Sequence, residues 1–348
     1  MSEAKFVLSK KVLIEQIKKL ENLGLKISYS YKTNKEVGNV LQKVSDCDFS
    51  IHAREEIEMI DDKKRIWFFT QAENVGEFEN ILGYGIRKFV IGNEIDLKNL
   101  LEAVGNKKVK IFLSLRMKFQ EHRIGTGKYF VYGMSSSKVN KLVLDVIENE
   151  FVEKIGIHIH RKSQNLSEWE IKSEIRDSLS DEVLNKISFI NFGGGLPSIY
   201  RSYIGKSDEY IFNKIKESIE FLKEKRIESY IEPGRFLAAP GIKLFTEIIQ
   251  VQGKNIVVNT TIYNCALDNV LTGTKMLVEG EIFDEALEGQ EYLIKGNSPT
   301  RDDIFRYKVK LKSANVGDKI IFLNAGAYNY TTDFFGYKKL KTEIVETF

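Results

Sequence analysis

The sequence has 348 residues, of which 43% are hydrophobic, 29% charged and 11% aromatic. Such a chain can bury a large core in one large domain or two moderate ones, which excludes a disordered or fibrous protein. Lys and Arg number 52 against 49 Asp and Glu. Because the two signs are mixed along the chain, no basic tract indicates a nucleic acid or a membrane surface as a partner.

The cysteine content and the N-terminal residues favour a reducing compartment. Cys47 and Cys265 lie too far apart for a ligand spacing such as C-x-x-C, which argues against a structural zinc and against a disulfide-rich secreted scaffold. Residues 1–11 carry no apolar core of signal-peptide length, and no stretch approaches the ~20 apolar residues of a membrane helix. We therefore expect a soluble, cytoplasmic protein without a metal centre.

Before about residue 240, short runs rich in β-branched and aromatic residues alternate with longer amphipathic segments that indicate helices, such as 12–23 and 72–82. The eight short runs are residues 27–31, 47–51, 66–70, 88–92, 110–116, 155–160, 187–192 and 228–232. Eight buried strands separated by helices predict a (β/α)8 barrel of the TIM type.

After about residue 241 the pattern changes to strand, turn, strand, which indicates an all-β second domain. The expected strands are residues 243–251, 255–261, 291–294 and 319–323. The first predicted helix precedes the first barrel strand, so we expect the residues before it to pair with the C-terminal sheet. The expected division is therefore an N-terminal segment (1–25) packing on the β-domain, a barrel (26–240) and a C-terminal β-domain (241–348).

Chemically distinctive residues follow four of the predicted barrel strands. Lys32 follows the first, His158 and His160 close the sixth, glycines 193–195 follow the seventh, and the segment 232–235 (EPGR) follows the eighth. Singly, each has an ordinary explanation: a solvated lysine, a structural histidine, a tight turn or a surface ion pair. Because barrel enzymes carry their chemistry at the C-terminal ends of the strands, their coincidence on one rim predicts a site.

These residues suit a phosphorylated cofactor that forms a covalent imine. The backbone N–H groups of residues 193–195 can approach a phosphate closely, and Arg235 can add a charge-assisted contact. The amine of Lys32 is a nucleophile for an aldehyde, and the carboxylate of Glu232 can keep a pyridine nitrogen protonated. With the imidazole of His160 against the ring face, the set predicts pyridoxal phosphate.

The same segments resemble the fold type III pyridoxal-phosphate enzymes, the group of ornithine and diaminopimelate decarboxylases, with alanine racemase as a more distant relative. The resemblance extends over nearly the whole chain and is carried by residues 29–34 (YSYKTN), 156–164 (GIHIHRKSQ), 191–195 (NFGGG), 231–235 (IEPGR) and 324–328 (NAGAY). It implies a barrel with a C-terminal β-domain, as in alanine racemase and ornithine decarboxylase.

The resemblance also implies roles for individual residues. Lys32, His160 and Glu232 would be catalytic, with the cofactor bound to Lys32 as a Schiff base. The implied cofactor-binding residues are Lys32, His160, Ser163, Gly193, Gly194, Gly195, Glu232, Gly234, Arg235 and Tyr328. A homodimer is implied too, with active sites shared across the interface and residues 298–303 contributed by the neighbouring subunit.

Departures from the family pattern concern the substrate. Arg301 stands where the decarboxylases carry a cysteine that enters the partner's active site, and it could meet an anionic substrate group or pair with Asp302 or Asp303. The Arg-Pro-x-x-Tyr segment of the diaminopimelate decarboxylases is not recognisable around residues 268–277. In the segment 49–56, Ser50 and Ala53 stand where relatives often place Asp or Ser.

The substrate therefore stays open at this stage. Asp268, Asp302 and Asp303 could bind a distal amine, which favours a basic amino acid, although they could equally be solvated loop carboxylates. Arg301 favours an anionic tail instead, and Phe335 is a further candidate contact. A modified amino acid of a natural-product pathway is also compatible with this set.

The leading hypothesis is a pyridoxal-phosphate-dependent decarboxylase acting on a basic or modified amino acid like diaminopimelate, ornithine or lysine. The first alternative is an amino-acid racemase, which favours a pyridine nitrogen that is not fully protonated, so Glu232 argues against it. The second alternative is a non-catalytic pyridoxal-phosphate-binding homologue, suggested by Arg301 at the cysteine position. Against it, the chain retains a whole β-domain.

Overall fold

The computed structural model describes residues 3–119, 132–205, 208–329 and 331–348. Eight parallel strands close into a barrel, with β9 pairing back onto β2. The barrel strands are β2 (Lys26–Ser30), β3 (Asp48–Ile51), β4 (Ile66–Phe69), β5 (Lys88–Ile91), β6 (Ile111–Arg116), β7 (Val152–His158), β8 (Phe189–Asn191) and β9 (Glu228–Ile231). The predicted (β/α)8 barrel and its eight strands are confirmed.

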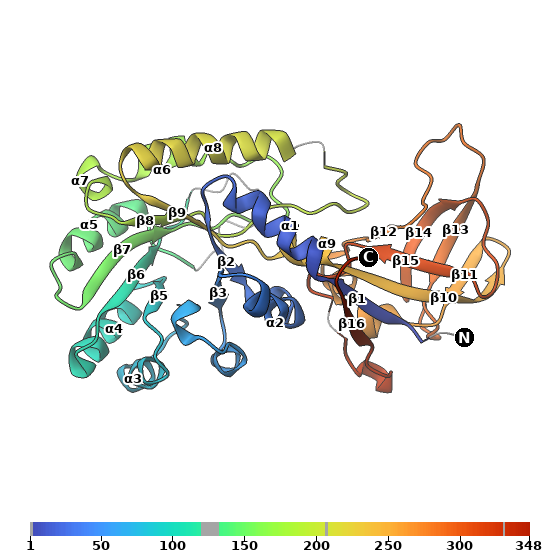
Figure 1. The fold of residues 1–348 in the computed structure, drawn as a ribbon, viewed down its shortest axis with the longest axis horizontal. Helices are drawn as coiled ribbons and strands as arrows, with labels where there is room; N and C mark the ends of the chain where they lie inside the picture. Colours follow the sequence, from blue (N-terminus) through green and yellow to red (C-terminus); the bar gives the residue numbers. More distant parts are fainter. Residues whose placement is uncertain (1–2, 120–131, 206–207, 330) are drawn as a thin grey trace.

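Helices surround the barrel strands (Figure 1). They are α1 (Lys10–Glu21), α2 (Lys35–Val44), α3 (Val75–Gly83), α4 (Glu94–Lys107), α5 (Ser136–Val146), α6 (Ile171–Ser178), α7 (Asp181–Leu184), α8 (Asp208–Glu224) and α9 (Arg235–Gly241). Short 3₁₀-helices follow β2 and β3, namely η1 (Tyr31–Thr33), η2 (Arg54–Met59) and η3 (Lys63–Arg65). The helices predicted over 12–23 and 72–82 correspond to α1 and α3.

Capping residues set where several of these helices begin. The side chain of Asn34 accepts hydrogen bonds from the backbone N–H groups of Glu36 and Val37 at the start of α2. Asn74 and Glu77 form a reciprocal capping box at the start of α3. Each such side chain satisfies N–H groups that have no partner inside the helix, so the βα turns at the rim of the barrel are held in place.

Aromatic side chains fill part of the barrel interior. Trp67 on β4 contacts both Phe189 on β8 and Tyr230 on β9 edge-to-face, with ring centroids 5.3 and 5.8 Å apart. Because β4 is not a neighbour of β8 or β9, these contacts cross the barrel. Gly156 on β7 leaves room for this packing, since a Cβ there would lie 2.5 Å from the ring and the carbonyl oxygen of Phe189.

The second domain is an eight-stranded sheet with the order β12-β15-β10-β11-β13-β14, to which β1 and β16 are added beside β10. Its strands are β1 (Lys5–Ser9), β10 (Ile242–Gln252), β11 (Asn255–Val258), β12 (Leu277–Val278), β13 (Gln290–Lys295), β14 (Ile304–Leu311), β15 (Lys319–Leu323) and β16 (Lys341–Val345). Short helices lie between them: α10 (Ile262–Cys265), α11 (Leu267–Thr272) and η5 (Phe334–Gly336). The sequence analysis had not identified β12, β14 or β16.

The N-terminal strand joins the two parts of the molecule. β1 pairs antiparallel with β10 and parallel with β16, and α1 then runs from the sheet to the barrel (Figure 1).

Cys47 and Cys265 are both buried as free thiols. In the part of the chain that the structure describes, no helix has the length and apolar character needed to span a bilayer.

The packing of Phe189 against β7 can be tested with Gly156→Ala. The added methyl group would meet backbone as well as ring atoms, so we expect the free energy of unfolding to fall by about 1–3 kcal/mol. Urea unfolding followed by circular dichroism measures the change. The control is Gly83→Ala at the end of α3, where an added Cβ meets nothing within 4 Å and stability should not fall. Equal stability of the two variants would contradict this account of the interior.

Candidate active site

A cavity of about 280 Å³ lies at the C-terminal ends of the barrel strands. Every predicted cofactor-binding residue except Gly193 lines it, namely Lys32, His160, Ser163, Gly194, Gly195, Glu232, Gly234, Arg235 and Tyr328. The lining residues come from segments that follow β2, β7, β8 and β9 and from the segment after β15. Residues up to about 300 positions apart in the sequence therefore meet around one space, as the rule for strand ends in barrels requires.

Lys32 lies in η1, directly after β2, and this segment is fixed from both sides. The hydroxyl of Tyr29 donates to the carbonyl oxygen of Asn34 at 3.0 Å, and the side-chain amide of Asn34 donates to the carbonyl oxygen of Gly326 at 2.8 Å. The backbone N–H of Tyr328 donates to the carbonyl oxygen of Thr33 at 3.0 Å. The cavity walls around the ε-amine displace water, and this desolvation lowers the pKa of Lys32 despite the opposing effect of Glu232.

The triple glycine after β8 forms a cradle that a side chain would fill. A Cβ at Gly193 would lie 2.1 Å from the carbonyl oxygen of Ile159, and one at Gly195 would lie 2.9 Å from that of Lys162. Both glycines have positive φ values, 66° and 113°, which L-residues rarely adopt. The carbonyl oxygen of Gly193 accepts from the backbone N–H of Glu232, and the backbone N–H of Gly194 donates to Nδ1 of His160 at 3.2 Å. Gly194 and Gly195 line the cavity. Bare backbone of this kind fits a phosphate group.

Gly234 and Arg235 complete this side of the cavity. A Cβ at Gly234 would lie 2.2 Å from Oγ1 of Thr33, so only glycine lets α9 start this close to the Lys32 segment. The guanidinium of Arg235 donates to both carboxylate oxygens of Asp268, at 2.6 and 3.1 Å, and to the hydroxyl of Tyr200. Its Nε donates to Ser163 at 3.3 Å. These bonds raise the pKa of Arg235 against the effect of its burial and hold it in one orientation.

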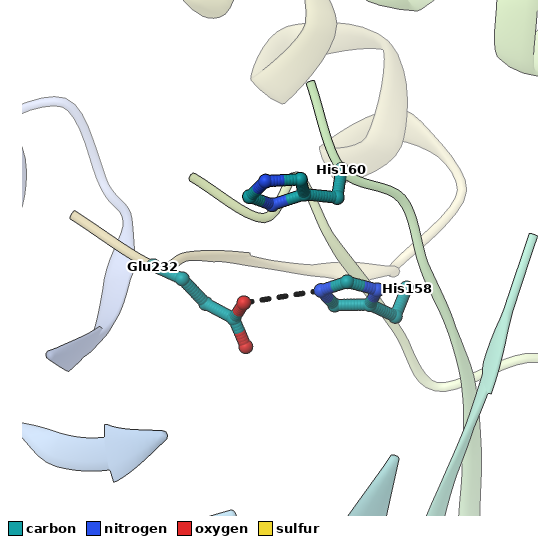
Figure 2. A group of neighbouring side chains, drawn as sticks. All are labelled: His158, His160 and Glu232. Atoms are coloured by element: carbon teal, nitrogen blue, oxygen red, sulfur yellow. Dashed lines mark hydrogen bonds and ion pairs between the residues drawn. The ribbon is translucent and has the colours of Figure 1, made fainter. Parts of the chain in front are cut away.

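The carboxylate of Glu232 is buried and receives three hydrogen bonds. Nε2 of His158 lies 3.0 Å from Oε2, as Figure 2 shows, and Oε1 accepts from Ser50 and Asn191 at 2.9 Å each. Burial alone would favour the neutral acid. The hydrogen bonds from His158 and Ser50 outweigh it and lower the pKa of Glu232 to about 2. The carboxylate is therefore ionised at neutral pH.

The histidines of this cluster are neutral. Burial lowers the pKa of His158, and desolvation by the cavity walls, together with the nearby Arg116, lowers the pKa of His160 to about 3. The two rings are stacked with centroids 6.3 Å apart and planes only 10° apart. Since an imidazole binds a metal along a lone pair in its ring plane, these near-parallel rings do not converge on one ion (Figure 2). The ring of His160 instead exposes a face to the cavity, which fits a flat aromatic group.

The residues suggested for the substrate do not line the cavity of their own chain. Asp268 is paired with Arg235, and Asp303 is fully buried, accepting from the backbone N–H groups of Ile262 and Ser298. Because their oxygens are engaged within the chain, we withdraw the substrate role suggested for these two carboxylates. Arg301 and Asp302 are exposed on the turn before β14. The side chain of Phe335 lies outside the described residues.

Two further residues of the cavity were missed in the sequence. His52 follows β3, stacks on Phe69 with centroids 4.5 Å apart, and has a pKa lowered to about 3 by burial and by Lys32. Arg116 ends β6, with its guanidinium 5.5 Å from the ring of Tyr132 and without a hydrogen bond or ion pair among the residues that the structure describes. Both stand at strand ends, so extending the same rule to β3 and β6 would have found them.

The fold and this site define a barrel protein built to hold a phosphorylated, flat aromatic cofactor next to a lysine. The family model described as pyridoxal-dependent decarboxylase, pyridoxal binding domain, matches residues 10–239. The chain belongs to this family, whose cofactor is pyridoxal phosphate. The bare glycine backbone, the open face of His160 and the ionised Glu232 fit the phosphate, ring and pyridine nitrogen of that group.

Curated relatives and solved structures agree with this assignment. The diaminopimelate decarboxylase of Bacillus methanolicus is 24% identical over 305 residues, covering 77% of this chain and 67% of the relative. That of Buchnera aphidicola subsp. Schizaphis graminum (strain Sg) is 27% identical over 217 residues, 55% of this chain and 52% of the relative. Three of the four curated alignments thus span about half the length of the relative.

Among solved structures, diaminopimelate decarboxylase from Helicobacter pylori complexed with L-lysine has a TM-score of 0.80 at 18% identity, covering 99% of this chain and 92% of that one. Arginine decarboxylase of Paramecium bursaria Chlorella virus, bound to agmatine, has a TM-score of 0.76 at 19% identity, covering 99% and 96%. At these identities the likeness shows the fold, and the predicted barrel with a C-terminal β-domain is confirmed over the full length of the chain.

The structural role of Asp268 can be separated from that of Asp302 with matched variants. Asp268→Asn leaves the buried guanidinium of Arg235 without its counter-charge, so we expect the free energy of unfolding to fall by about 3–5 kcal/mol. Asp302→Asn changes an exposed carboxylate and should stay within about 0.5 kcal/mol of the unchanged protein. Both are measured by urea unfolding. Similar stabilities would show that the Arg235 pair contributes little.

Proposed function

We propose that the protein is a pyridoxal-phosphate-dependent decarboxylase that removes the α-carboxylate of an amino acid, with the cofactor bound through Lys32. The observation that carries the proposal is the meeting of the Lys32 amine, the bare backbone of Gly194 and Gly195, and the ionised Glu232 around one small cavity. Membership of the pyridoxal-dependent decarboxylase family supports it.

Each residue has a separate task in this proposal. Gly194, Gly195 and the hydroxyls of Ser163 and Tyr328 hold the phosphate, while His160 lies against the ring. Glu232 accepts a hydrogen bond from the pyridine nitrogen. Bound pyridoxal phosphate supplies a protonated ring that accepts the electron pair left when carbon dioxide departs.

The two basic side chains of the cavity, Lys32 and Arg116, have different proposed roles. The lowered pKa of Lys32 increases its neutral, nucleophilic fraction at neutral pH. Arg116 stays charged, and its guanidinium faces the cavity. A partly buried guanidinium in a cavity is stabilised by an anionic partner, so we assign Arg116 to a negatively charged oxygen of the cofactor or substrate.

The ionised state of Glu232 favours decarboxylation over racemisation. A carboxylate acceptor keeps the pyridine nitrogen protonated, whereas a racemase favours a ring nitrogen that is not fully protonated. A protonated ring would withdraw electrons from any bond at Cα of the substrate, so the orientation of the substrate decides which of these bonds breaks. A site that shields the α-carboxylate from water favours loss of that group. Measuring carbon dioxide release beside loss of optical rotation separates the two reactions.

The substrate that we propose is an amino acid with a distal amine. The curated relatives are named diaminopimelate decarboxylases, and the similar solved structures include lysine/ornithine and arginine decarboxylases. A role in cytoplasmic amino-acid biosynthesis is consistent with these names. Carbon dioxide release from L- and D-lysine, ornithine, arginine and diaminopimelate by the cofactor-loaded protein tests the substrate class.

We also propose a homodimer whose active sites are completed by the neighbouring subunit. Arg301 and Asp302 are exposed on the turn before β14 and lie outside the cavity of their own chain, which leaves both available to a second copy. Size-exclusion chromatography with light scattering measures the oligomeric state. A fully active monomer would contradict the shared site.

Lys32→Ala is expected to abolish both the visible absorption band of lysine-bound pyridoxal phosphate and the release of carbon dioxide, because no other amine takes its place at the end of β2. Absorption spectroscopy and a carbon dioxide assay measure the two effects. The control is Lys35→Ala, three residues further along at the start of α2 and outside the cavity lining, which should keep both signals. An active, coloured Lys32→Ala protein would refute the assignment.

Complementation between two variants tests the shared active site. We expect Arg301→Glu to lower kcat/KM by about tenfold or more, because it replaces a guanidinium with a carboxylate that repels the α-carboxylate of the substrate bound by the partner subunit. If each site combines Lys32 of one subunit with Arg301 of the other, refolding a mixture of Lys32→Ala and Arg301→Glu proteins should restore activity above that of either alone. Activity no higher than the average of the two pure variants would exclude shared sites.

A further inference from the structure

The orientation of Glu232 is set by three strands. Its hydrogen-bond donors are Ser50 at the end of β3, His158 at the end of β7 and Asn191 at the end of β8, at 2.9, 3.0 and 2.9 Å. We call these three residues the carboxylate clamp. A carboxylate offers about four acceptor positions, so the clamp occupies three and leaves one. Since Glu232 lines the cavity, the remaining position is accessible to a ligand there.

The direction of the His158 bond is fixed by the surroundings of the ring. Nδ1 is buried and has no hydrogen-bond partner among the described residues. The ring packs against Phe69 in a T-shaped arrangement, with centroids 5.2 Å apart and planes at 83°. A second proton, on Nδ1, would leave a buried and charged N–H without an acceptor among the described residues, which is strongly unfavourable. His158 therefore carries one proton, on Nε2, and acts only as a donor to the ionised Glu232.

The Ser50 bond is directed in the same way from the opposite side. The hydroxyl of Ser50 donates to Glu232, so the hydroxyl of Ser28, 2.7 Å away, must donate to Ser50. Both serines are fully buried. The resulting chain from Ser28 through Ser50 to Glu232 is polarised toward the carboxylate, and each hydrogen bond in such a chain strengthens the next.

We propose that Ser50 and His158 are positioning residues that hold the Glu232 carboxylate in the one orientation in which its remaining acceptor position faces the pyridine nitrogen of the cofactor. This inference rests on the proposed function. A purely structural role would only satisfy a buried carboxylate. The clamp predicts in addition that cofactor affinity and turnover depend on these donors, because a carboxylate free to rotate binds the ring N–H less well.

The experiment compares Ser50→Ala and His158→Leu with His158→Gln, whose amide can still donate to Glu232. For each apoprotein, the dissociation constant of pyridoxal phosphate is measured from the visible absorption band, and kcat and KM are measured after loading. We expect Ser50→Ala and His158→Leu to raise the dissociation constant and lower kcat by about 10–100-fold each, with KM changing by less than about threefold. His158→Gln should recover most of both losses.

A matched control exists in the barrel. Ser114 on β6 is fully buried like Ser50, but its hydroxyl has no partner among the described residues. Ser114→Ala removes the same hydroxyl from the same kind of environment and should leave cofactor affinity, kcat and KM unchanged. Circular dichroism and urea unfolding report the stability of every variant. If His158→Leu does not fold, the comparison of Ser50→Ala with Ser114→Ala decides the question.

The outcomes separate this inference from the proposed function. If Ser50→Ala and His158→Leu bind pyridoxal phosphate and turn over substrate as the unchanged protein does, the clamp is only structural and the inference is wrong, while Lys32→Ala still tests the function. Losses equal in Ser50→Ala and Ser114→Ala would also overturn it, since they would reflect packing. If the unchanged protein gives no visible band with pyridoxal phosphate, the proposed function fails, and the clamp fails with it.

Discussion

The buried negative charge of Glu232 is the constraint on which the active site depends. Removing a carboxylate from water is expensive unless hydrogen bonds and nearby positive charge replace the lost solvation. Here the replacement comes from donors on β3, β7 and β8, three strands that meet only because the barrel is closed. The same closure brings the Lys32 amine and the glycine cradle to the cavity. The fold that buries Glu232 and the proposed cofactor chemistry therefore share one side chain.

Much of the barrel could be predicted from the sequence because buried parallel strands are short, continuously apolar runs, and eight of them alternate with amphipathic segments. The C-terminal sheet was harder. β16 (KTEIV) lies at the edge of the sheet and carries charged residues, and β14 (IFRYKVKL) alternates apolar and basic residues, so neither produces the same signal. Periodicity identifies a buried strand reliably, whereas an edge strand is specified by its partner, which the local sequence does not contain.

The candidate site shows the same limit. The residues at strand ends were found because a general rule of barrels indicates where to look, and His52 and Arg116 were missed because the rule was not applied to β3 and β6. The pairing of Arg235 with Asp268 was beyond sequence reasoning, since only the folded chain places the second residue of α11 against α9. That pairing changes the chemical interpretation. A guanidinium already paired with Asp268 presents a positioned N–H donor to the cavity rather than an unpaired positive charge.

The contacts between the two domains bear on the alternative of a non-catalytic cofactor carrier. Asn34, the N-cap of α2, and Thr33, the last residue of η1, bond to Gly326 and Tyr328 of the segment that follows β15. A Cβ at Gly326 would lie 1.9 Å from the carbonyl oxygen of Ala238, so this segment is pressed between η1 and α9. Tyr328 adopts a φ of 57°, a costly conformation for a non-glycine residue that persists only where surrounding contacts enforce it. The C-terminal domain thus fixes the Lys32 segment and adds a tyrosine to the cavity. This fixed geometry supports the proposed enzyme over a protein that only stores the cofactor, because a reaction depends on holding the reacting groups in a precise orientation.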